Sequence, residues 1–343
     1  MAPLRKSLEI RTSPHILSGY SVDTIMFNVV LALLPVTAFS VYAFGLPGAL
    51  TLTVAVTSCV FTEHLVCNLN ARPTTVGDWS VTITGLLYGL TLPPSLPLWM
   101  VAAGGIIAVA LGKALFGGLG SNAFNPALVA RAVLQAAFPV AMTSWMPAFT
   151  PGRFTSLPSS TLTLPFTEPV YDVVTGATPL ALWKFERTIT SARELAFGFT
   201  SGSAGETSAA LILLGGAYLV ARNMMNWRIP AAIFVSVIVL SGALHLANPE
   251  QHATPLFHLL AGGLMLGAVF MASDMVGSPM TSKGIYIYGA LIGVLTVVIR
   301  TWGGMPEGMM YAILFGNALS PHLDRLIQPK VYGTSGKKKE KAA

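Results

Sequence analysis

The sequence has few charged residues. Asp, Glu, Lys and Arg together make up 10% of its 343 residues, whereas 53% are hydrophobic. Soluble domains carry about 25% charged residues, so this composition excludes an ordinary soluble protein and indicates an integral membrane protein. The net charge of +6 comes from basic residues at the chain ends and in short loops. That distribution is typical of membrane topology signals and argues against a nucleic-acid-binding surface.

Metal-ligating residues are also scarce. The two cysteines, Cys59 and Cys67, cannot ligate an iron–sulfur cluster within this chain. If they share a helix they lie roughly 12 Å apart along its axis, which excludes a disulfide. The six histidines are scattered without a zinc-binding spacing. The run Gly117-Gly118-Leu119-Gly120 lacks the lysine and the strand of a phosphate-binding loop. No catalytic residues are therefore expected within the chain.

Apolar stretches dominate the rest of the chain, in two groups of five on either side of a polar interruption. The stretches are 22–43, 48–66, 80–92, 98–116, 121–138, 207–222, 229–248, 256–273, 284–302 and 307–323. Some are short for a hydrocarbon core about 30 Å thick. The third ends at Pro93-Pro94, and the eighth ends at Asp274 with Gly277-Ser278-Pro279 after it. Such interruptions indicate broken helices around a central site.

The two groups also resemble each other. Residues 122–128 align with residues 317–323 at a constant offset, since 317 − 122 and 323 − 128 both equal 195. An odd number of spans per repeat implies that the copies insert with opposite orientations. The sequence therefore predicts an all-α polytopic membrane protein with about ten transmembrane helices, arranged as two inverted five-helix repeats with broken helices. The alternative is a ten-helix bundle whose internal similarity is accidental.

Basic residues predict the orientation of these segments. Most of them, including Arg5, Arg72 and Lys113, fall on the same side as the N-terminus. Both termini are therefore predicted to be cytoplasmic, with the interruption facing outward, the periplasm in a Gram-negative cell. The expected divisions are a cytoplasmic segment, a first membrane repeat, an extracytoplasmic loop region, a second membrane repeat and a cytoplasmic Lys-rich tail, at residues 1–21, 22–138, 139–205, 206–324 and 325–343.

A short motif lies in the polar interruption, Asp172-Val173-Val174-Thr175-Gly176-Ala177-Thr178. By composition alone it is ordinary turn chemistry, with Pro179 holding Thr178 extended. It resembles Asp-x-x-[Ser/Thr]-Gly-Ala-Thr, the sequence recognised by the flavin transferase that acts on bacterial respiratory proteins. Every specified position is filled. In such proteins the last Thr carries FMN as a phosphoester. The resemblance assigns that role to Thr178, with Asp172, Thr175, Gly176 and Ala177 as the surrounding motif and Thr175 as the alternative attachment residue.

The motif within a polytopic chain resembles the RnfD/NqrB family. Its members are the D component of the Rnf electron-transport complex and the B component of the sodium-translocating NADH:quinone reductase, and the length is closer to that of the Rnf component. The resemblance implies a bacterial inner-membrane component of a ferredoxin:NAD oxidoreductase that carries covalent FMN and couples electron transfer to Na⁺ or H⁺ movement. It also implies a noncovalent riboflavin, which no residue locates. The implied partners are the other Rnf components, the flavin transferase and the lipid bilayer, with no nucleic acid.

Polar groups within the apolar stretches are the remaining site candidates. A charge near the bilayer centre costs at least about 2.5–3.5 kcal/mol, so Arg131, mid-way along the fifth stretch, requires an explanation. Asn122 and Asn125 precede it at a predicted helix start. We expect the segment from Asn122 to Arg131 to contact a flavin or a quinone-like group in the core. The alternative is that Arg131 pairs with Glu63 or with a backbone carbonyl.

Two other functional classes stay open at this point. Inverted five-helix repeats also build urea-transporter-like pores, in which case the flavinylation motif would be a coincidence. The chain could also serve as a scaffold whose ion path runs through a neighbouring protein of the complex. Covalent flavin on the polypeptide distinguishes the electron-carrier interpretation from both.

Overall fold

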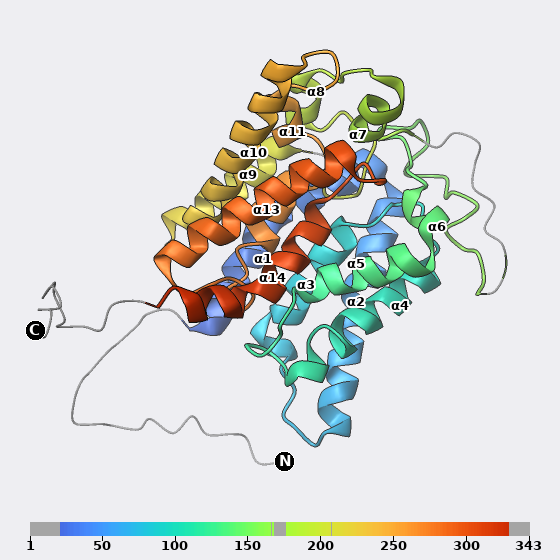
Figure 1. The fold of residues 1–343 in the computed structure, drawn as a ribbon. Helices are drawn as coiled ribbons and strands as arrows, with labels where there is room; N and C mark the ends of the chain where they lie inside the picture. The colour runs from blue at the N-terminus through green and yellow to red at the C-terminus, as the bar shows by residue number, and fades with distance from the viewer. Residues whose placement is uncertain (1–20, 166, 168–175, 207, 329–343) are drawn as a thin grey trace, which may run out of the picture.

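The computed structural model describes residues 21–165, 167, 176–206 and 208–328, and no β-strand occurs among them. Helices make up most of this part of the chain (Figure 1). They are α1 (Val22–Phe44), α2 (Leu46–Leu69), η1 (Val76–Asp78), α3 (Ser80–Leu90), α4 (Leu98–Ala110), η2 (Ala114–Phe116), α5 (Pro126–Ala137), α6 (Pro139–Thr143), α7 (Pro179–Ala181), η3 (Leu182–Glu186), α8 (Ala192–Phe197), α9 (Ala209–Ala221), α10 (Arg228–Ala247), α11 (Pro255–Leu260), α12 (Leu264–Leu266), η4 (Gly267–Met271), α13 (Ser282–Trp302) and α14 (Met309–Leu326).

Five helices of the described part are long and apolar enough to cross a membrane. They are α1, α2, α10, α13 and the segment Leu98–Phe116, which joins α4 to η2. The helices α3, α5 and α9 are apolar but shorter. The prediction of a polytopic helical membrane protein is therefore confirmed, while the arrangement of ten spans as inverted repeats stays a prediction.

Side-chain caps explain where several helices begin. The side-chain oxygen of Asn125 accepts hydrogen bonds from the N–H groups of Ala127 and Leu128 at 3.1 and 3.4 Å. Pro126 takes the first position of α5, where a missing N–H costs nothing. Ser208 and Thr254 cap α9 and α11 in the same way. The helix start predicted after Gly120 is thus set at Asn125.

Two pairs of helices, α2 with α4 and α10 with α13, pack with very close backbones. In the α2–α4 pair, Gly105 lies directly against the Ser58 side chain, where a Cβ would not fit. In the α10–α13 pair, Gly293 lies against Ser236 in the same manner. Small residues allow helices to approach this closely, which strengthens van der Waals packing inside a membrane. Each group of helices therefore contains the same kind of small-residue contact.

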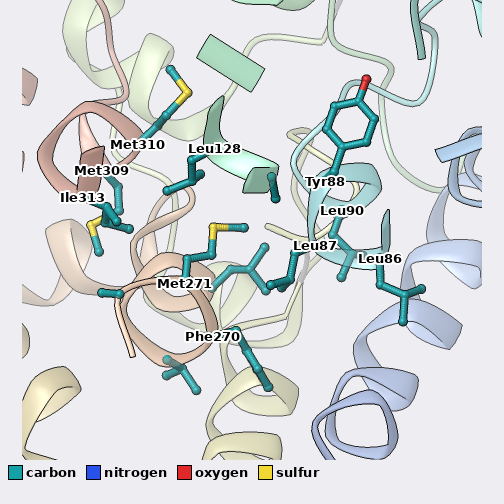
Figure 2. Close-up of a cluster of buried hydrophobic side chains, with 14 of the residues drawn as sticks. Leu86, Leu87, Tyr88, Leu90, Leu128, Phe270, Met271, Met309, Met310 and Ile313 are labelled. Carbon is teal, nitrogen blue, oxygen red and sulfur yellow. The ribbon is translucent and has the colours of Figure 1, made fainter. Parts of the chain in front are cut away.

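The two helix groups share one hydrophobic core. α1 packs against α9, and Tyr218 donates a hydrogen bond to the side-chain oxygen of Asn28 at 2.6 Å. At the centre, short segments from both groups bring apolar side chains together, among them Leu87 of α3, Leu128 of α5 and Met271 of η4 (Figure 2). The broken segments thus lie in the shared core, at the junction between the two helix groups.

Each broken segment is completed by chain from elsewhere. α3 ends at Leu90, and the carbonyls of Leu90 and Leu92 accept hydrogen bonds from the N–H groups of Gly205 and Ala204, at 2.6 and 3.1 Å. The end of the polar interruption therefore closes the first break. The eighth apolar stretch divides into α11, α12 and η4. The short elements of the interruption lie at one end of the bundle, where α7 and α8 accompany α11 (Figure 1).

Candidate functional site

Thr178 stands at the start of the short helix α7. Its backbone is extended, with φ −71° and ψ 152°, and its Oγ1 accepts a hydrogen bond from the N–H of Ala181 at 3.2 Å. Pro179 occupies the first helical position, so the extended conformation predicted from the sequence is confirmed. The side chain is well covered, at 7% exposed. Oγ1 is the acceptor in this capping contact, so the hydroxyl proton of Thr178 takes no part in it.

The residues just before Thr178 lie close to other parts of the loop region. The N–H of Gly176 donates to the carbonyl of Trp145 at 2.7 Å. A Cβ added at Gly176 would meet Ser201 Oγ at 2.6 Å, so only glycine fits beside that serine. Ala177 is exposed. The other two predicted motif residues, Asp172 and Thr175, lie outside the described residues.

The helical segment that follows Thr178 is fastened to α13 and the loop after it. Lys184 Nζ donates to the carbonyls of Arg300 and Met305, at 3.3 and 3.0 Å, and to that of Gly303. Burial lowers the pKa of Lys184 from its usual value, but a charged amine at a helix C-terminus is favoured by these carbonyls. Arg187 adds a hydrogen bond to the carbonyl of Gln251 at 2.8 Å. The Thr178 segment is thus anchored to the second helix group.

A buried ion pair holds the region on which this segment rests. Arg300 donates to the carbonyls of His258 and Ala261 and to the carboxylate of Glu307. Its Nη2 lies 3.1 Å from Glu307 Oε2. Leu180 packs against Gly262, where an added Cβ would meet its Cδ1 at 2.5 Å. The residue two positions after Thr178 therefore touches the loop that this ion pair fixes.

Asn122 and Asn125 lie together, at the start of α5 and against the end of η4. The Asn125 amide donates to the carbonyl of Met271 at 3.3 Å, and the Asn122 amide donates to Asp274 Oδ2 at 3.4 Å. Both asparagines line a cavity of about 410 Å³. Its walls are mostly apolar, and Lys113 is among its polar lining residues. A cavity of this size and character is of the kind that binds flat organic ligands.

Arg131 lies apart from the two asparagines. It lines a different cavity, of about 10 Å³, together with Glu206 and Glu307. The alternative that paired Arg131 with Glu63 is wrong, because Glu63 pairs with Lys113 at 2.7 Å. Within the part of the chain that the structure describes, Arg131 Nε has no hydrogen-bond partner, so the carbonyl alternative is not supported at that atom. The two ends of the predicted segment from Asn122 to Arg131 therefore line different cavities.

Comparison with known proteins identifies the family. Residues 9–333 match the family described as NQR2, RnfD, RnfE. The chain belongs to this family. One relative, from Clostridium ljungdahlii, is named as the D subunit of a proton-translocating ferredoxin:NAD(+) oxidoreductase complex, and it is 39% identical over 97% of this chain and 98% of its own length. The corresponding Na(+)-translocating protein of Acetobacterium woodii is 40% identical over 98% of this chain and 99% of its own length.

A third NQR2, RnfD, RnfE relative has a more general name. It is the D subunit of an ion-translocating oxidoreductase complex from Stutzerimonas stutzeri, 40% identical over 93% of this chain and 94% of its own length. The two relatives named for different ions are almost equally similar to this chain, at 39% and 40% identity. Overall similarity therefore shows the family without selecting the ion.

The sequence prediction missed several buried charges of this family member. Lys113 Nζ contacts both oxygens of Glu63 at 2.7 Å and Ser80 Oγ at 2.7 Å, and Thr75 also donates to Glu63. Glu307 was missed as well. It accepts from the N–H groups of Gly308 and Met309, both at 3.0 Å, at the start of α14. A glutamate beside a glycine before an apolar stretch is a signal that sequence inspection can use.

Metal binding has no visible site in the described part of the chain. Within those residues, no group of three or more His, Cys, Asp or Glu side chains is placed to hold a metal ion. The polar groups near Thr178 and Asn125 are mostly amides, hydroxyls, carbonyls and basic side chains, with Asp274 as the carboxylate beside Asn122. Such groups bind organic cofactors through hydrogen bonds.

Proposed function

We propose that this chain is the D subunit of an Rnf-type complex, an ion-translocating ferredoxin:NAD oxidoreductase. The observation that carries this proposal is the family match over residues 9–333, with relatives of that name that match almost end to end. The chain is a membrane component of a translocase, and its partners are the other members of the complex. A urea-transporter-like pore without a redox role loses its basis, because the chain belongs to a family of oxidoreductase components.

Within that complex, Thr178 carries FMN through a phosphoester bond. The support is the complete motif at 172–178, the extended backbone of Thr178 and the glycine-only space at Gly176. FMN supplies one- and two-electron transfer, and the protein supplies its position and environment. Lys184 and Leu180 hold the attachment segment against the second helix group. Because Thr178 is 7% exposed, the transferase has to act before this segment docks or while it is displaced.

The intact mass of the purified polypeptide tests this attachment. We expect one added FMN on the native chain, visible also as a fluorescent band on a denaturing gel. Thr178→Ala is expected to remove both signals, as is expression without a flavin transferase. Thr175→Ser, which the motif allows, is the matched control at the neighbouring hydroxyl and is expected to keep both signals. A native mass equal to that of the polypeptide alone would refute the covalent flavin. A band that survives Thr178→Ala but not Thr175→Ala would move the attachment site.

The helices form ten membrane-crossing segments in two inverted repeats, with both termini cytoplasmic and Thr178 on the periplasmic side of the inner membrane. The support is the paired small-residue contact, Gly105 with Ser58 and Gly293 with Ser236. Each group also has a buried cation toward the end of its fourth apolar stretch, Lys113 in one and Arg300 in the other. Single cysteines placed at Ala177 and Gly118 test the orientation. An impermeant thiol reagent added to intact spheroplasts is expected to label the first and not the second.

The cavity beside Asn122 and Asn125 holds a second, noncovalent flavin or a quinone-like group. The specific support is its volume of about 410 Å³ and the presence of both asparagines among the polar residues that line its mostly apolar wall. Extraction of the purified complex followed by chromatography identifies a released ligand. We expect Asn122→Leu to lower its amount while the FMN mass on Thr178 stays constant. Unchanged ligand content in this variant would refute the assignment of the cavity.

A further inference from the structure

Beside the loop on which the Thr178 segment rests lies a small polar cavity. Its volume is about 10 Å³, close to the space that one water molecule needs. Arg131, Glu206 and Glu307 line it, with Thr91 and Ser203 as neighbouring hydroxyls. The three charged groups come from α5, from the end of the polar interruption and from the residues before α14. The cavity thus joins both helix groups.

Arg131 is the unusual member of this cavity. It is 8% exposed, and its Nε has no hydrogen-bond partner within the described residues. It interacts electrostatically with both Glu206 and Glu307. No hydrogen bond between its guanidinium and either carboxylate occurs in the described part of the chain. A buried guanidinium nitrogen without a direct partner is costly, so water and a carboxylate across the cavity are needed to compensate it.

The two glutamates are held in different ways. The Glu307 carboxylate forms an ion pair with Arg300. It also accepts hydrogen bonds from the N–H groups of Gly263, Gly308 and Met309. Such a carboxylate is strongly held in its charged form. The carboxylate oxygens of Glu206 lie close to Gly202 and Gly263. A Cβ added at either glycine would meet one of these oxygens at 3.1 or 3.3 Å. It lies deep in the molecule, yet part of its surface stays accessible.

Glu206 has only Arg131 as a favouring charge, with Ser203 as a polar neighbour, so it is the less compensated of the two carboxylates. The charged groups that face it are Arg131 from α5, Glu307 from the loop before α14 and, behind Glu307, Arg300 from α13. The Glu307 charge opposes a charge on Glu206, and the Arg131 charge favours it. A change of about one charge nearby is enough to alter the balance between these opposed effects.

We propose that Glu206 takes up one proton when an electron reaches the flavin on Thr178, with Arg131 as the positioning residue that keeps Glu206 ionised beforehand. This proposal rests on the proposed attachment of FMN. The flavin gains one electron that originates from reduced ferredoxin, or from dithionite in the test below. An O–H bond forms on a Glu206 carboxylate oxygen with a proton taken up from the bulk solvent. The net charge of the region is then unchanged. Reoxidation of the flavin releases the electron to its acceptor and the proton to water.

Redox difference infrared spectroscopy tests the proposal on the purified, intact complex. The probe is dithionite reduction, and the signal is the C=O stretch of a protonated carboxylic acid in the reduced-minus-oxidised spectrum. The native complex is expected to show this band. Glu206→Gln is expected to lose it, and Glu206→Asp is expected to keep it at a shifted frequency. Glu186→Gln, which changes an exposed glutamate of η3, is the matched control and is expected to keep it unchanged.

Arg131 variants give an independent readout. Arg131→Gln removes the cation that holds Glu206 ionised, so Glu206 is expected to be protonated in both redox states and its band to vanish from the difference spectrum. Arg131→Lys keeps the charge and is expected to restore it. A band that survives Glu206→Gln would overturn the proposal. The FMN mass on each variant separates the two hypotheses: absent FMN refutes the attachment, whereas retained FMN with an unaltered band refutes the role of Glu206.

Discussion

At the scale of single residues, the loop region depends on close contacts that leave little freedom. Gly176 faces Ser201 with no room for a side chain, and Thr178 caps α7 through the same Oγ1 that is proposed to carry FMN. On the proposed attachment, the motif at residues 172–178 has two physical requirements. One is recognition by the proposed transferase, and the other is the fit of the folded segment.

These two requirements can be separated at Gly176. Gly176→Ala places a Cβ only 2.6 Å from Ser201 Oγ, so the segment is expected to dock poorly and to become more accessible to protease. The double variant Gly176→Ala with Ser201→Gly removes the obstructing side chain. We expect it to restore protease resistance, measured by limited proteolysis and mass spectrometry. Equal cleavage of the single and double variants would contradict the steric explanation.

The pair Lys113 and Glu63 shows the energetic weight of buried charge. Lys113→Met leaves the Glu63 carboxylate buried without its cation, which costs about 3–5 kcal/mol. A markedly lower thermal unfolding temperature in detergent is therefore expected. The double variant Lys113→Met with Glu63→Gln is expected to recover most of the loss, because no uncompensated charge remains. Additive losses in the double variant would show that the pair is not coupled.

At the scale of elements, η3 is held by a few strong contacts rather than by a large apolar face. Lys184 reaches the carbonyls at the end of α13 and in the loop beyond it. Leu180 supplies the apolar anchor, within a small cluster that includes Leu195 and Phe257. A segment held in this way opens more easily than the transmembrane core.

Lys184→Met tests this anchoring. The substitution removes three hydrogen bonds from a charged group. Each contributes up to about 1.5–3 kcal/mol, and less where the group is partly exposed, so their loss is expected to speed local amide exchange by roughly tenfold or more. Hydrogen–deuterium exchange on peptides that cover η3 measures the effect. Amide exchange in the part of α13 that precedes Arg300 is expected to stay constant. Glu186→Gln is the control on the same element, and an equal effect there would contradict a specific role for the lysine.

At the scale of the whole molecule, the two helix groups are built around equivalent close approaches. Gly105 lies against Ser58 in one group and Gly293 lies against Ser236 in the other. The broken segments α3 and η4 meet between the groups, where Figure 2 shows their leucine, methionine and phenylalanine side chains. Disturbance of either helix pair is therefore expected to propagate to the shared core.

Gly105→Val and Gly293→Val are expected to have similar effects. Each introduces side-chain atoms where the partner helix already lies, a kind of overpacking that typically costs about 1–3 kcal/mol. Thermal unfolding of the purified protein in detergent measures the loss. Gly304→Ala is the control, because nothing lies within 4 Å of its added Cβ. A large effect of one variant and none of the other would argue against equivalent helix pairs.

Local sequence patterns were enough to predict the membrane class, the apolar stretches and the breaks at prolines and glycines, whereas the helix start expected just after Gly120 lies at Asn125. They suffice because these features depend on local composition and on backbone restrictions that a few neighbouring residues impose. The family also follows from the chain alone, since a short motif and an overall match are properties of its residues in order.

Which charges meet depends on the packing of the helices. One sequence-based alternative paired Glu63 with Arg131, but the fold brings Lys113 to Glu63 and places Arg131 opposite Glu206 and Glu307. The fold also separates Arg131 from Asn122 and Asn125, which the sequence prediction had grouped. The physical reason is that ion pairing depends on distances of a few ångströms between helices far apart in the chain. Those distances are set by helix packing, which no local pattern records.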